Sequence, residues 1–479
     1  MHIDAVILAR IQFAFTIMFH YLFPPLSIGL GGLLVIMESL YLKTKNPIYE
    51  SMTRFWTKVF AINFSIGVAS GIVMEFQFGT NWAGYSNYVG DVFGAALAAE
   101  GIFAFFLESG FLAVLLFGWE RVSPKVHFFS TLMVAFGATF SALWINIANS
   151  WQQTPAGYHL IQHGAFTRAE VTDFWAVVFN PSALPRFTHA VLGGWVQAAF
   201  FVMSIAAFYL LRKQHVEFAK KSLMIGLVAA AITLPFQSLV GSYQAEIIAK
   251  YQPAKLSAFE GHFHSAKNAP LYAIGIPDIK HGKVDYAIAL PGMLSLLAKH
   301  DVNAVIQGWY DFPKADRPPL EVPFYSFHLM IGLGILMLIV SWFSLGMLWM
   351  KKLYEQRWLL WVLVASVIMP YLANQMGWVA AEVGRQPWIV YNLLKTSEAT
   401  SKIVTSGHIA ISLGMFILIY GLLFILFVYS LDRKIRKGPE LMPALAGNTA
   451  NMEPSTEAWM SLTGERNDPA DRTDMIEED

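Results

Sequence analysis

The chain alternates between long apolar stretches and shorter polar ones along most of its length. A helix needs roughly 20 apolar residues to cross a hydrocarbon core about 30 Å thick. No stretch alternates apolar and polar residues with period two for long enough to suggest a membrane β-barrel. The stretches long enough to span cover about residues 8–40, 59–78, 93–119, 127–149, 187–211, 222–244, 325–350, 358–381 and 406–431. The pattern therefore predicts an all-α integral membrane protein with nine transmembrane helices.

Basic residues gather in every second connection between the predicted spans. The second and fourth connections are nearly free of them close to the span ends. The basic residues of the odd-numbered connections and of the segment after the last span are Lys43, Lys45, Arg54, Lys58, Arg121, Lys125, Arg212, Lys213, Lys220, Lys221, Lys351, Lys352, Arg357, Arg433, Lys434, Arg436 and Lys437. Lys and Arg accumulate on the cytoplasmic side of membrane proteins. We therefore expect the N-terminus outside and the C-terminus in the cytoplasm.

The spans divide the chain into four parts. Residues 1–244 hold the first six spans, and residues 325–438 hold the last three. Between them, residues 245–324 form one long extracytoplasmic segment that is polar and rich in Pro and His. A loop of this length is usually either functional or a flexible excursion. Residues 439–479 form a polar tail that ends in TDMIEED, a composition typical of a disordered segment.

Composition narrows the chemistry that the chain can perform. Of 479 residues, 56% are hydrophobic and 14% are charged, and Lys+Arg balance Asp+Glu at 33 each. Nothing in this balance suggests a nucleic-acid partner. The chain has no cysteine, which excludes Fe–S clusters, thiolate metal sites and the C-x-x-C-H attachment of c-type haem. Haem held by His, Met or a carboxylate remains compatible with the sequence.

Residues that can ligate iron recur in the outer half of the predicted spans. His189 and Met330 lie near the outer ends of spans five and seven, Glu382 closes span eight at its outer end, and His20 lies deeper in span one. Ionisable residues inside a membrane are costly and therefore suggest function. Taken singly, an intramembrane His is often a packed or hydrogen-bonded residue, and a Met is often core filler. The shared depth is what favours ligation.

The residue types suit two kinds of haem site. His and Met on opposite faces of a haem iron give a six-coordinate, low-spin centre suited to electron transfer, and His189 with Met330 is such a pair. A single His or carboxylate leaves the other face open, as an oxygen-reacting haem requires. His20 and Glu382 fit that second role.

Two further carboxylates lie one after the other along span three. Glu100 and Glu108 are eight residues apart, so they share one helix face and are about 12 Å apart along the axis. Glu108 lies nearer the cytoplasm and Glu100 nearer the zone of candidate ligands. Such a file suits a proton relay. The alternative is a pair of structural hydrogen bonds to neighbouring helices.

A series of motifs, in order along the chain, resembles subunit I of the cytochrome bd-type terminal oxidases, the haem-carrying and quinol-oxidising subunit. These motifs are RIQFAFTIMFHYLFPPLSIGL, FWTKVFAINFSIGVASGIVMEFQFGTNW, GDVFGAALAAEGIFAFFLES, SALWINIANSWQQTPAG, FTHAVLGGW, QPAKLSAFEGHF, FHLM and GWVAAEVGRQPW. The resemblance covers about residues 6–431. It implies a bacterial inner-membrane protein with a partner subunit II, and it allows small single-span subunits.

The resemblance also implies ligands for three haems. His189 and Met330 look like the axial pair of the low-spin haem b. His20 and Glu382 look like ligands of a high-spin haem b and of haem d, or of a haem b in the place of haem d. Which of these two residues binds which haem stays open, because it differs among members.

Further roles follow from the same resemblance. Glu100 is expected beside the di-haem site, as a ligand or last proton donor, with Glu108 below it. Trp378 and Arg385 are expected among the cofactor-binding residues. Lys255 and Glu260, in the long extracytoplasmic segment, match a pair implicated in quinol oxidation.

Two departures from the family pattern stand out. Many members have Arg two residues before the axial Met, where this chain has His328, also expected to bind a cofactor. Arg would supply a permanent charge and a fork of donors there, so the potential of the low-spin haem and the donor preference, ubiquinol or menaquinol, stay open. The long segment also lacks an insertion found in one branch, so the chain resembles the short-loop branch, which includes cyanide-insensitive oxidases.

The resemblance implies that quinol is oxidised at the outer face and that O2 is reduced to water with cytoplasmic protons, which separates charge without a pump. Haem–copper oxidases are a rival within the same class, but their site needs adjacent histidines, and the sequence contains no His-His dipeptide. A proton-coupled transporter that uses Glu100, Glu108 and Glu382 as carriers is the rival from another class. It predicts a colourless protein with helices broken at the midplane, and the absence of an internal repeat weakens it.

Overall fold

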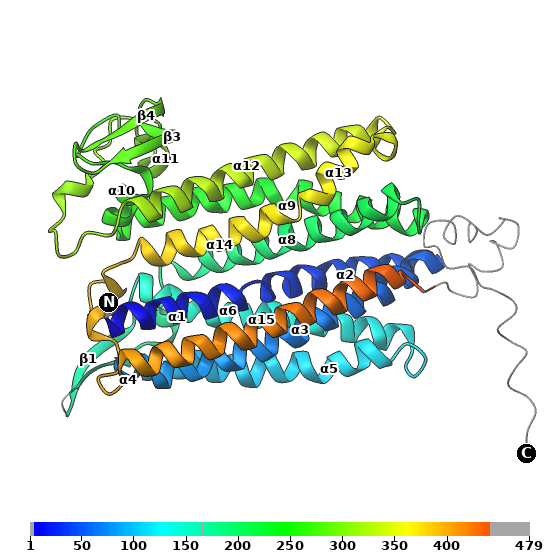
Figure 1. Ribbon diagram of the computed structural model, residues 1–479, viewed down its shortest axis with the longest axis horizontal. Coiled ribbons are helices and arrows are strands. Elements are labelled where there is room, and N and C mark those ends of the chain that lie inside the picture. The colour runs from blue at the N-terminus through cyan, green and yellow to red at the C-terminus, as the bar shows by residue number, and fades with distance from the viewer. Residues whose placement is uncertain (1–3, 165, 441–479) are drawn as a thin grey trace, which may run out of the picture. The chain divides into compact units, whose positions relative to one another are not determined.

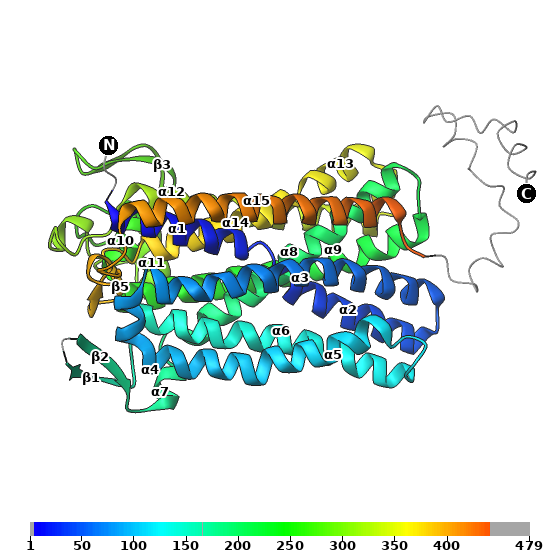
Figure 2. The ribbon, with the colours of Figure 1, turned by 60° about the horizontal axis from the view of Figure 1, so that its bottom comes forward.

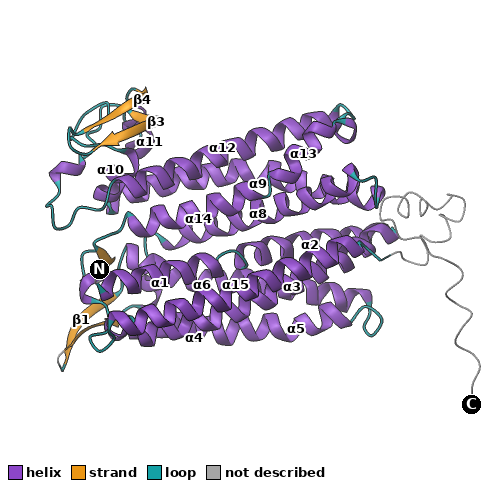
Figure 3. Cartoon of the chain, viewed as in Figure 1, coloured by secondary structure: helices purple, strands orange, loops and turns teal. Residues whose placement is uncertain are grey.

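The computed structural model describes residues 4–164 and 166–440, and most of this part is helical (Figure 3). Within it, nine helical segments are long and apolar enough to cross a membrane. The prediction of nine transmembrane helices is confirmed. The described residues up to Pro439 belong to one compact unit. The expected disorder of the tail concerns residues 441–479, which lie outside the described residues.

The first predicted span consists of two helices, α1 (Ala5–His20) and α2 (Pro24–Thr44). The chain turns at Tyr21–Phe23 and resumes the helix at Pro24 and Pro25. Proline has no amide hydrogen to donate and its ring clashes with the preceding turn, so it fits best in the first turn of a helix. His20 is therefore the last residue of α1 and lies beside a break, where the sequence analysis expected one uninterrupted span.

The next five spans follow the predicted order. They are formed by α3 (Pro47–Thr80), by α4 (Ala83–Ala99) with α5 (Phe106–Phe117), and by α6 (Pro124–Gln153), α8 (Ala183–Leu211) and α9 (Val216–Tyr251). Asn46 and Ser123 cap the starts of α3 and α6 by accepting hydrogen bonds from backbone amides, and a proline follows each cap. Between α4 and α5 the helix widens into a π-helical stretch, Glu100–Phe105, a distortion often found at functional sites.

The last three spans contain a second break. They are formed by α12 (Glu321–Trp349), by α13 (Arg357–Ala365) with α14 (Ile368–Val383), and by α15 (Ser406–Lys437). The break between α13 and α14 falls at Ser366–Val367, before Pro370. Broken helices are also what the transporter alternative predicts, so these breaks alone do not decide between the two functions.

Helix α8 is the most buried of the nine spans and packs against α2 and α9. Its contact with α2 depends on glycine, because a Cβ at Gly29 would collide with the backbone carbonyl of Gly194. Close approach of small residues drives helix packing in membranes, where the apolar lipid offers no hydrophobic gain for helix association. Helices α5 and α6 form a second pair on the other side of α2 (Figure 2).

The long segment between α9 and α12 is folded. After α9 it contains α10 (Pro253–Glu260), the antiparallel strands β3 (Leu271–Asp278) and β4 (Lys283–Leu290), α11 (Met293–Lys299) and a 3-10 turn η2 (Trp309–Asp311). These elements lie over the ends of α9 and α12 (Figure 1). Leu256, Ala269, Leu294 and Ile306 form a small core of their own beneath the strands.

The remaining strands lie at the same end of the bundle as the start of α1 and the long segment (Figures 1 and 3). They form two hairpins, β1 (Tyr158–His163) with β2 (Phe166–Val171), and β5 (Trp388–Val390) with β6 (Leu394–Lys395). The short elements α7 (Phe174–Val178) and η4 (Thr396–Glu398) accompany them, and η3 (Leu353–Glu355) lies in the connection between α12 and α13. The basic connections therefore share one end of the bundle and the folded loops share the other.

The expected orientation can be tested directly, because the native chain has no cysteine. Lys280→Cys places a thiol in the exposed turn between β3 and β4, and Lys213→Cys places one between α8 and α9. We expect a membrane-impermeant maleimide to label Lys280→Cys in intact spheroplasts and Lys213→Cys only in inverted vesicles. The opposite pattern would reverse the orientation inferred from the basic residues.

Candidate functional site

A cavity of about 1440 Å³ lies within the bundle and reaches the folded loops at its outer end. Pockets for a single small ligand measure roughly 300–1,000 Å³, so this cavity has room for more than one group. It brings together ten of the residues singled out from the sequence. These are His20, Glu100, Glu108, His189, Lys255, Glu260, Met330, Trp378, Glu382 and Arg385.

His189 and Met330 reach the cavity from α8 and α12, and glycines face both of them. A Cβ at Gly241 on α9 would lie 3.4 Å from Cε1 of His189, and one at Gly377 on α14 would lie 2.9 Å from the Met330 sulfur. The buried Nδ1 of His189 has no hydrogen-bond partner among the described residues. An imidazole and a thioether with space beside them fit an axial pair for haem iron.

His20 presents one defined nitrogen at the break between α1 and α2. Its Nδ1 lies 3.0 Å from the Ser70 hydroxyl oxygen, and that hydroxyl donates to the carbonyl of Ile66 at 2.9 Å. In the tautomer that carries its hydrogen on Nδ1, the ring donates to Ser70. The lone pair of Nε2 is then free, the arrangement that metal-binding histidines commonly show. Gly71 leaves space beside the ring.

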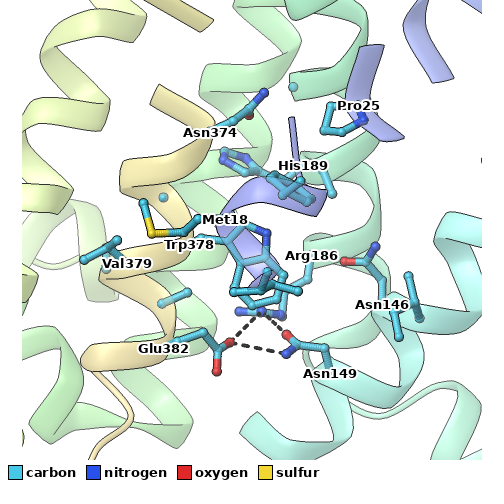
Figure 4. A pocket seen from close by; sticks show the side chains of 18 of the residues that line it. Met18, Pro25, Asn146, Asn149, Arg186, His189, Asn374, Trp378, Val379 and Glu382 are labelled. Carbon is cyan, nitrogen blue, oxygen red and sulfur yellow. Dashed lines mark hydrogen bonds and ion pairs between the residues drawn. The ribbon is translucent and has the colours of Figure 1, made fainter. Parts of the chain in front are cut away.

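Glu382 lies at the end of α14 in a polar cluster (Figure 4). Its Oε2 accepts a hydrogen bond from Arg385 at 2.5 Å. Its Oε1 accepts from Asn149 at 3.3 Å and from Gln153 at 3.2 Å, and lies 3.7 Å from Nη2 of Arg186. A carboxylate in this position is held by charge and by amide donors. To ligate iron, one of its oxygens has to exchange these partners for the metal.

Trp378 and Arg385 complete the wall around Glu382. The indole of Trp378, one turn before Glu382 on α14, packs edge-to-face on Tyr21 with the ring centres 5.6 Å apart. Arg385 is 5% exposed and also donates to Gln152 at 3.0 Å. Gln152 in turn contacts the Tyr85 hydroxyl. Both side chains are thus held from behind by residues of other helices.

Lys255 and Glu260 lie on the short helix α10, which closes the outer end of the cavity. Lys255 is 2% exposed and donates to Gln153 at 2.9 Å. Burial lowers its pKa well below the usual value, and the positive charges of Arg186 and Arg385 lower it further against the opposing effect of Glu382.

Glu260 is a second buried titratable group at this end of the cavity. Its side chain is buried, and burial raises its pKa to about 8. A carboxyl group with this pKa can take up and release a proton near neutral pH, which is what a general base or acid requires.

Glu100 and Glu108 line the cavity on the other side of the candidate ligands. Glu100 begins the π-helical stretch and accepts a hydrogen bond from Ser141 of α6 at 2.6 Å. Glu108 is 5% exposed, and its buried Oε1 has no partner in the part of the chain that the structure describes. Gly137 lets α6 approach closely here. Both carboxylates therefore line the cavity from span three. Glu100 has a hydrogen-bond donor in Ser141, and Glu108 has one oxygen without a partner among the described residues.

His328 is not among the residues that line the cavity. Its Nδ1 lies 2.8 Å from the carbonyl of Phe324, one turn earlier on α12, and its Nε2 lies 2.7 Å from the carbonyl of Tyr272 on β3. The side chain therefore links strand β3 of the folded loop to α12 close to Met330. Sequence analysis grouped it with the cofactor-binding residues because it stands where many family members have Arg, and its partner in the loop, 56 residues away, gave no local signal.

Sequence analysis missed three residues of the Glu382 cluster, namely Arg186, Asn149 and Gln153. A signal was present for Arg186, an arginine one helical turn before the candidate ligand His189. Asn149 and Gln153 lie in the motif SALWINIANSWQQTPAG, but their partners on α14 are more than 200 residues away.

A family model described as cytochrome bd terminal oxidase subunit I matches residues 8–439 of the chain. The chain belongs to this family. The relation proposed from the motifs is thereby confirmed, and membership in this family implies a multi-pass membrane protein with haem cofactors. Two features of the cavity fit bound haem. One is the free lone pair on Nε2 of His20, and the other is the space beside His189 and Met330.

Individual members are similar over nearly the whole length. Cytochrome bd ubiquinol oxidase subunit 1 of Bacillus subtilis (strain 168) is 40% identical over 447 residues, which cover 91% of this chain and 94% of that protein. Cytochrome bd-II ubiquinol oxidase subunit 1 of Escherichia coli (strain K12) is 36% identical, with 92% and 98% covered. The solved bd oxidase from Geobacillus thermodenitrificans superposes with a TM-score of 0.85 at 31% identity, and the match covers 91% of this chain and 99% of that one.

The raised pKa of Glu260 predicts a pH dependence of stability. A carboxyl whose pKa is higher in the folded than in the unfolded state contributes stability below its unfolded pKa of 4.5, and this contribution is lost as pH rises through about 8. We expect the oxidase complex to lose thermal stability between about pH 5 and 9, and Glu260→Gln to reduce that loss. Glu217→Gln, at an exposed position, serves as the control, and identical pH profiles for wild type and Glu260→Gln would contradict the assignment.

Proposed function

We propose that the chain is the haem-bearing catalytic subunit of a respiratory quinol:O2 oxidoreductase in the bacterial cytoplasmic membrane. The observation that carries this proposal is the single cavity that joins His20, His189, Met330 and Glu382 to the outer pair of Lys255 and Glu260. Membership in the bd oxidase family and the ubiquinol oxidase names of the two relatives support it.

The ligand assignments follow the residue chemistry of the cavity. His189 and Met330 would hold the low-spin haem b, and His20 and Glu382 would hold the high-spin haem b and a third haem, haem d or haem b. Haem, when bound, supplies the electron transfer and the reduction of oxygen. Trp378 and Arg385 position the Glu382 end of the cavity through the contacts described above.

Quinol oxidation is assigned to the outer end of the cavity. Glu260, with its pKa near 8, accepts a proton from a quinol hydroxyl and releases it to the outside. Lys255 donates a hydrogen bond to the quinone oxygen from a position held by Gln153. Each two-electron oxidation of a quinol releases two protons, so two quinols supply the four electrons that one O2 needs.

Proton supply for oxygen reduction is assigned to the opposite side. Glu108 takes up protons that come from the cytoplasm and passes them toward Glu100, which holds them beside the candidate oxygen site. Four such protons complete the formation of two waters from each O2. Because protons leave outside and enter from the cytoplasm, charge is separated across the membrane without a pump.

Other components complete the assembly. The family name makes this chain subunit I, so a membrane subunit II is its expected partner. Small single-span subunits would add to the same complex.

The haem assignments are tested by a reduced-minus-oxidised optical spectrum of the purified complex, with pyridine haemochrome analysis of the extracted haems. We expect haem bands, with a far-red chlorin band if the third group is haem d and b-type bands alone if it is haem b. Met330→Leu should convert the low-spin signal to a five-coordinate one. Met415→Leu, on the exposed face of α15, should leave it unchanged. A folded, colourless wild-type protein would overturn the proposal in favour of the transporter.

The proton assignment predicts a selective defect in Glu108→Gln. A glutamine keeps the shape of the side chain but carries no exchangeable acid proton, so steady-state quinol oxidase activity should fall by about 10²-fold. Reduction of the low-spin haem by quinol in a single turnover should stay near the wild-type rate. Glu170→Gln in the β1–β2 hairpin is the matched control. Equal loss of both rates in Glu108→Gln would point to a general structural defect.

A further inference from the structure

Arg186 occupies a distinctive place in the cavity wall. It lies on α8 three residues before His189, which puts the two side chains on one helix face and about 4.5 Å apart along the axis. Its Nη2 donates to the Oδ1 of Asn149 and lies 3.7 Å from the Oε1 of Glu382 (Figure 4). The buried Nε has no hydrogen-bond partner among the residues that the structure describes.

The charges around Arg186 do not balance. Arg186 and Arg385 carry two permanent positive charges, and both contact the single carboxylate of Glu382. The Nε of Arg385 is likewise buried and unpartnered within the described chain. The buried Lys255 adds a further amine, donating to Gln153 nearby. A buried charge without a counter-ion is strongly unfavourable. The excess positive charge of Arg186 and Arg385 therefore favours the binding of a second anion in the cavity.

The side chain at position 328 does not face the cavity in which that anion would lie. Both ring nitrogens of His328 face backbone carbonyls, of Phe324 and of Tyr272, and the side chain lies outside the cavity lining. In members with Arg at this place, the sequence pattern implies a permanent charge beside the axial Met. Here the guanidinium that faces the cavity on the His189 side comes from α8.

We propose that Arg186 binds a carboxylate of the haem held at His189, and that it supplies the permanent positive charge which position 328 does not provide in this chain. Haem carries two propionate groups, and a guanidinium presents a planar fork of N–H donors that matches a carboxylate. Nε and Nη2 of Arg186 form this fork with the two N–H groups on one edge of the guanidinium, while the second hydrogen of Nη2 stays with Asn149. The inference rests on the proposed function and assigns a further cofactor-binding residue to the same site.

A positive charge beside the iron favours the reduced haem, which carries one positive charge fewer. Arg186→Gln should therefore shift the reduction equilibrium of the low-spin haem toward the ferric form by about tenfold, or about 59 mV for a one-electron couple. Arg186→Lys keeps the charge and should stay within about twofold of the wild type. Arg168→Gln, an arginine of the β1–β2 hairpin paired with Asp91 outside the cavity, should have no effect.

A second readout reports on the carboxylate itself. Redox-difference infrared spectra of complexes whose haem carries 13C in its carboxyl groups isolate the propionate bands. We expect these bands to move in Arg186→Gln and in Arg186→Lys, because both lose the bidentate fork, and to stay in place in Arg168→Gln. If Arg186→Gln does not assemble, Arg186→Lys still carries the test through this band.

Two outcomes would overturn the assignment. One is a propionate band and a potential unchanged in Arg186→Gln. The other is an unchanged band in Arg186→Lys with haem fully bound. A wild-type complex without haem would instead overturn the proposed function, so the two failures are distinguishable.

Discussion

The structure depends on one constraint, that polar and charged groups within a membrane must be satisfied from inside the protein. The cluster around Glu382 meets this constraint with partners from two other helices and one turn, namely Asn149 and Gln153 on α6, Arg186 on α8 and Arg385 just past α14. These bonds hold the outer halves of the helices in one arrangement. They also leave an excess of positive charge facing the cavity, which prepares it for anionic cofactors.

The positions of the helices separate the two proton chemistries of the proposed reaction. Glu260 lies on the loop helix α10 at the outer end, whereas Glu108 lies eight residues after Glu100 in span three, toward the basic end of the bundle. Between them the cavity is lined by the candidate iron ligands. Electrons have to cross this middle region while protons move only at its two ends, and this separation is what turns a chemical reaction into charge transfer across a membrane.

The breaks in the helices and the folded loop position the site more than the straight parts of the spans do. The turn before Pro24 puts His20 at a helix end, where Ser70 orients its ring. The π-helical stretch begins at Glu100. His328 joins β3 to α12, so the loop that carries Glu260 is anchored close to Met330. A change in the loop can therefore reach the candidate low-spin site directly.

The sequence by itself determined the nine spans, their order and the depth of His189, Met330 and Glu382, because hydrophobic length and helical rise are local properties of the chain. It also carried the motifs of the family. Only the tertiary structure decided which side chains share one cavity. It places His328 against the carbonyl of Tyr272 and outside the cavity lining, whereas Arg186 lines the cavity. These contacts join residues dozens to hundreds of positions apart, and their free energy depends on helix packing that no local pattern encodes.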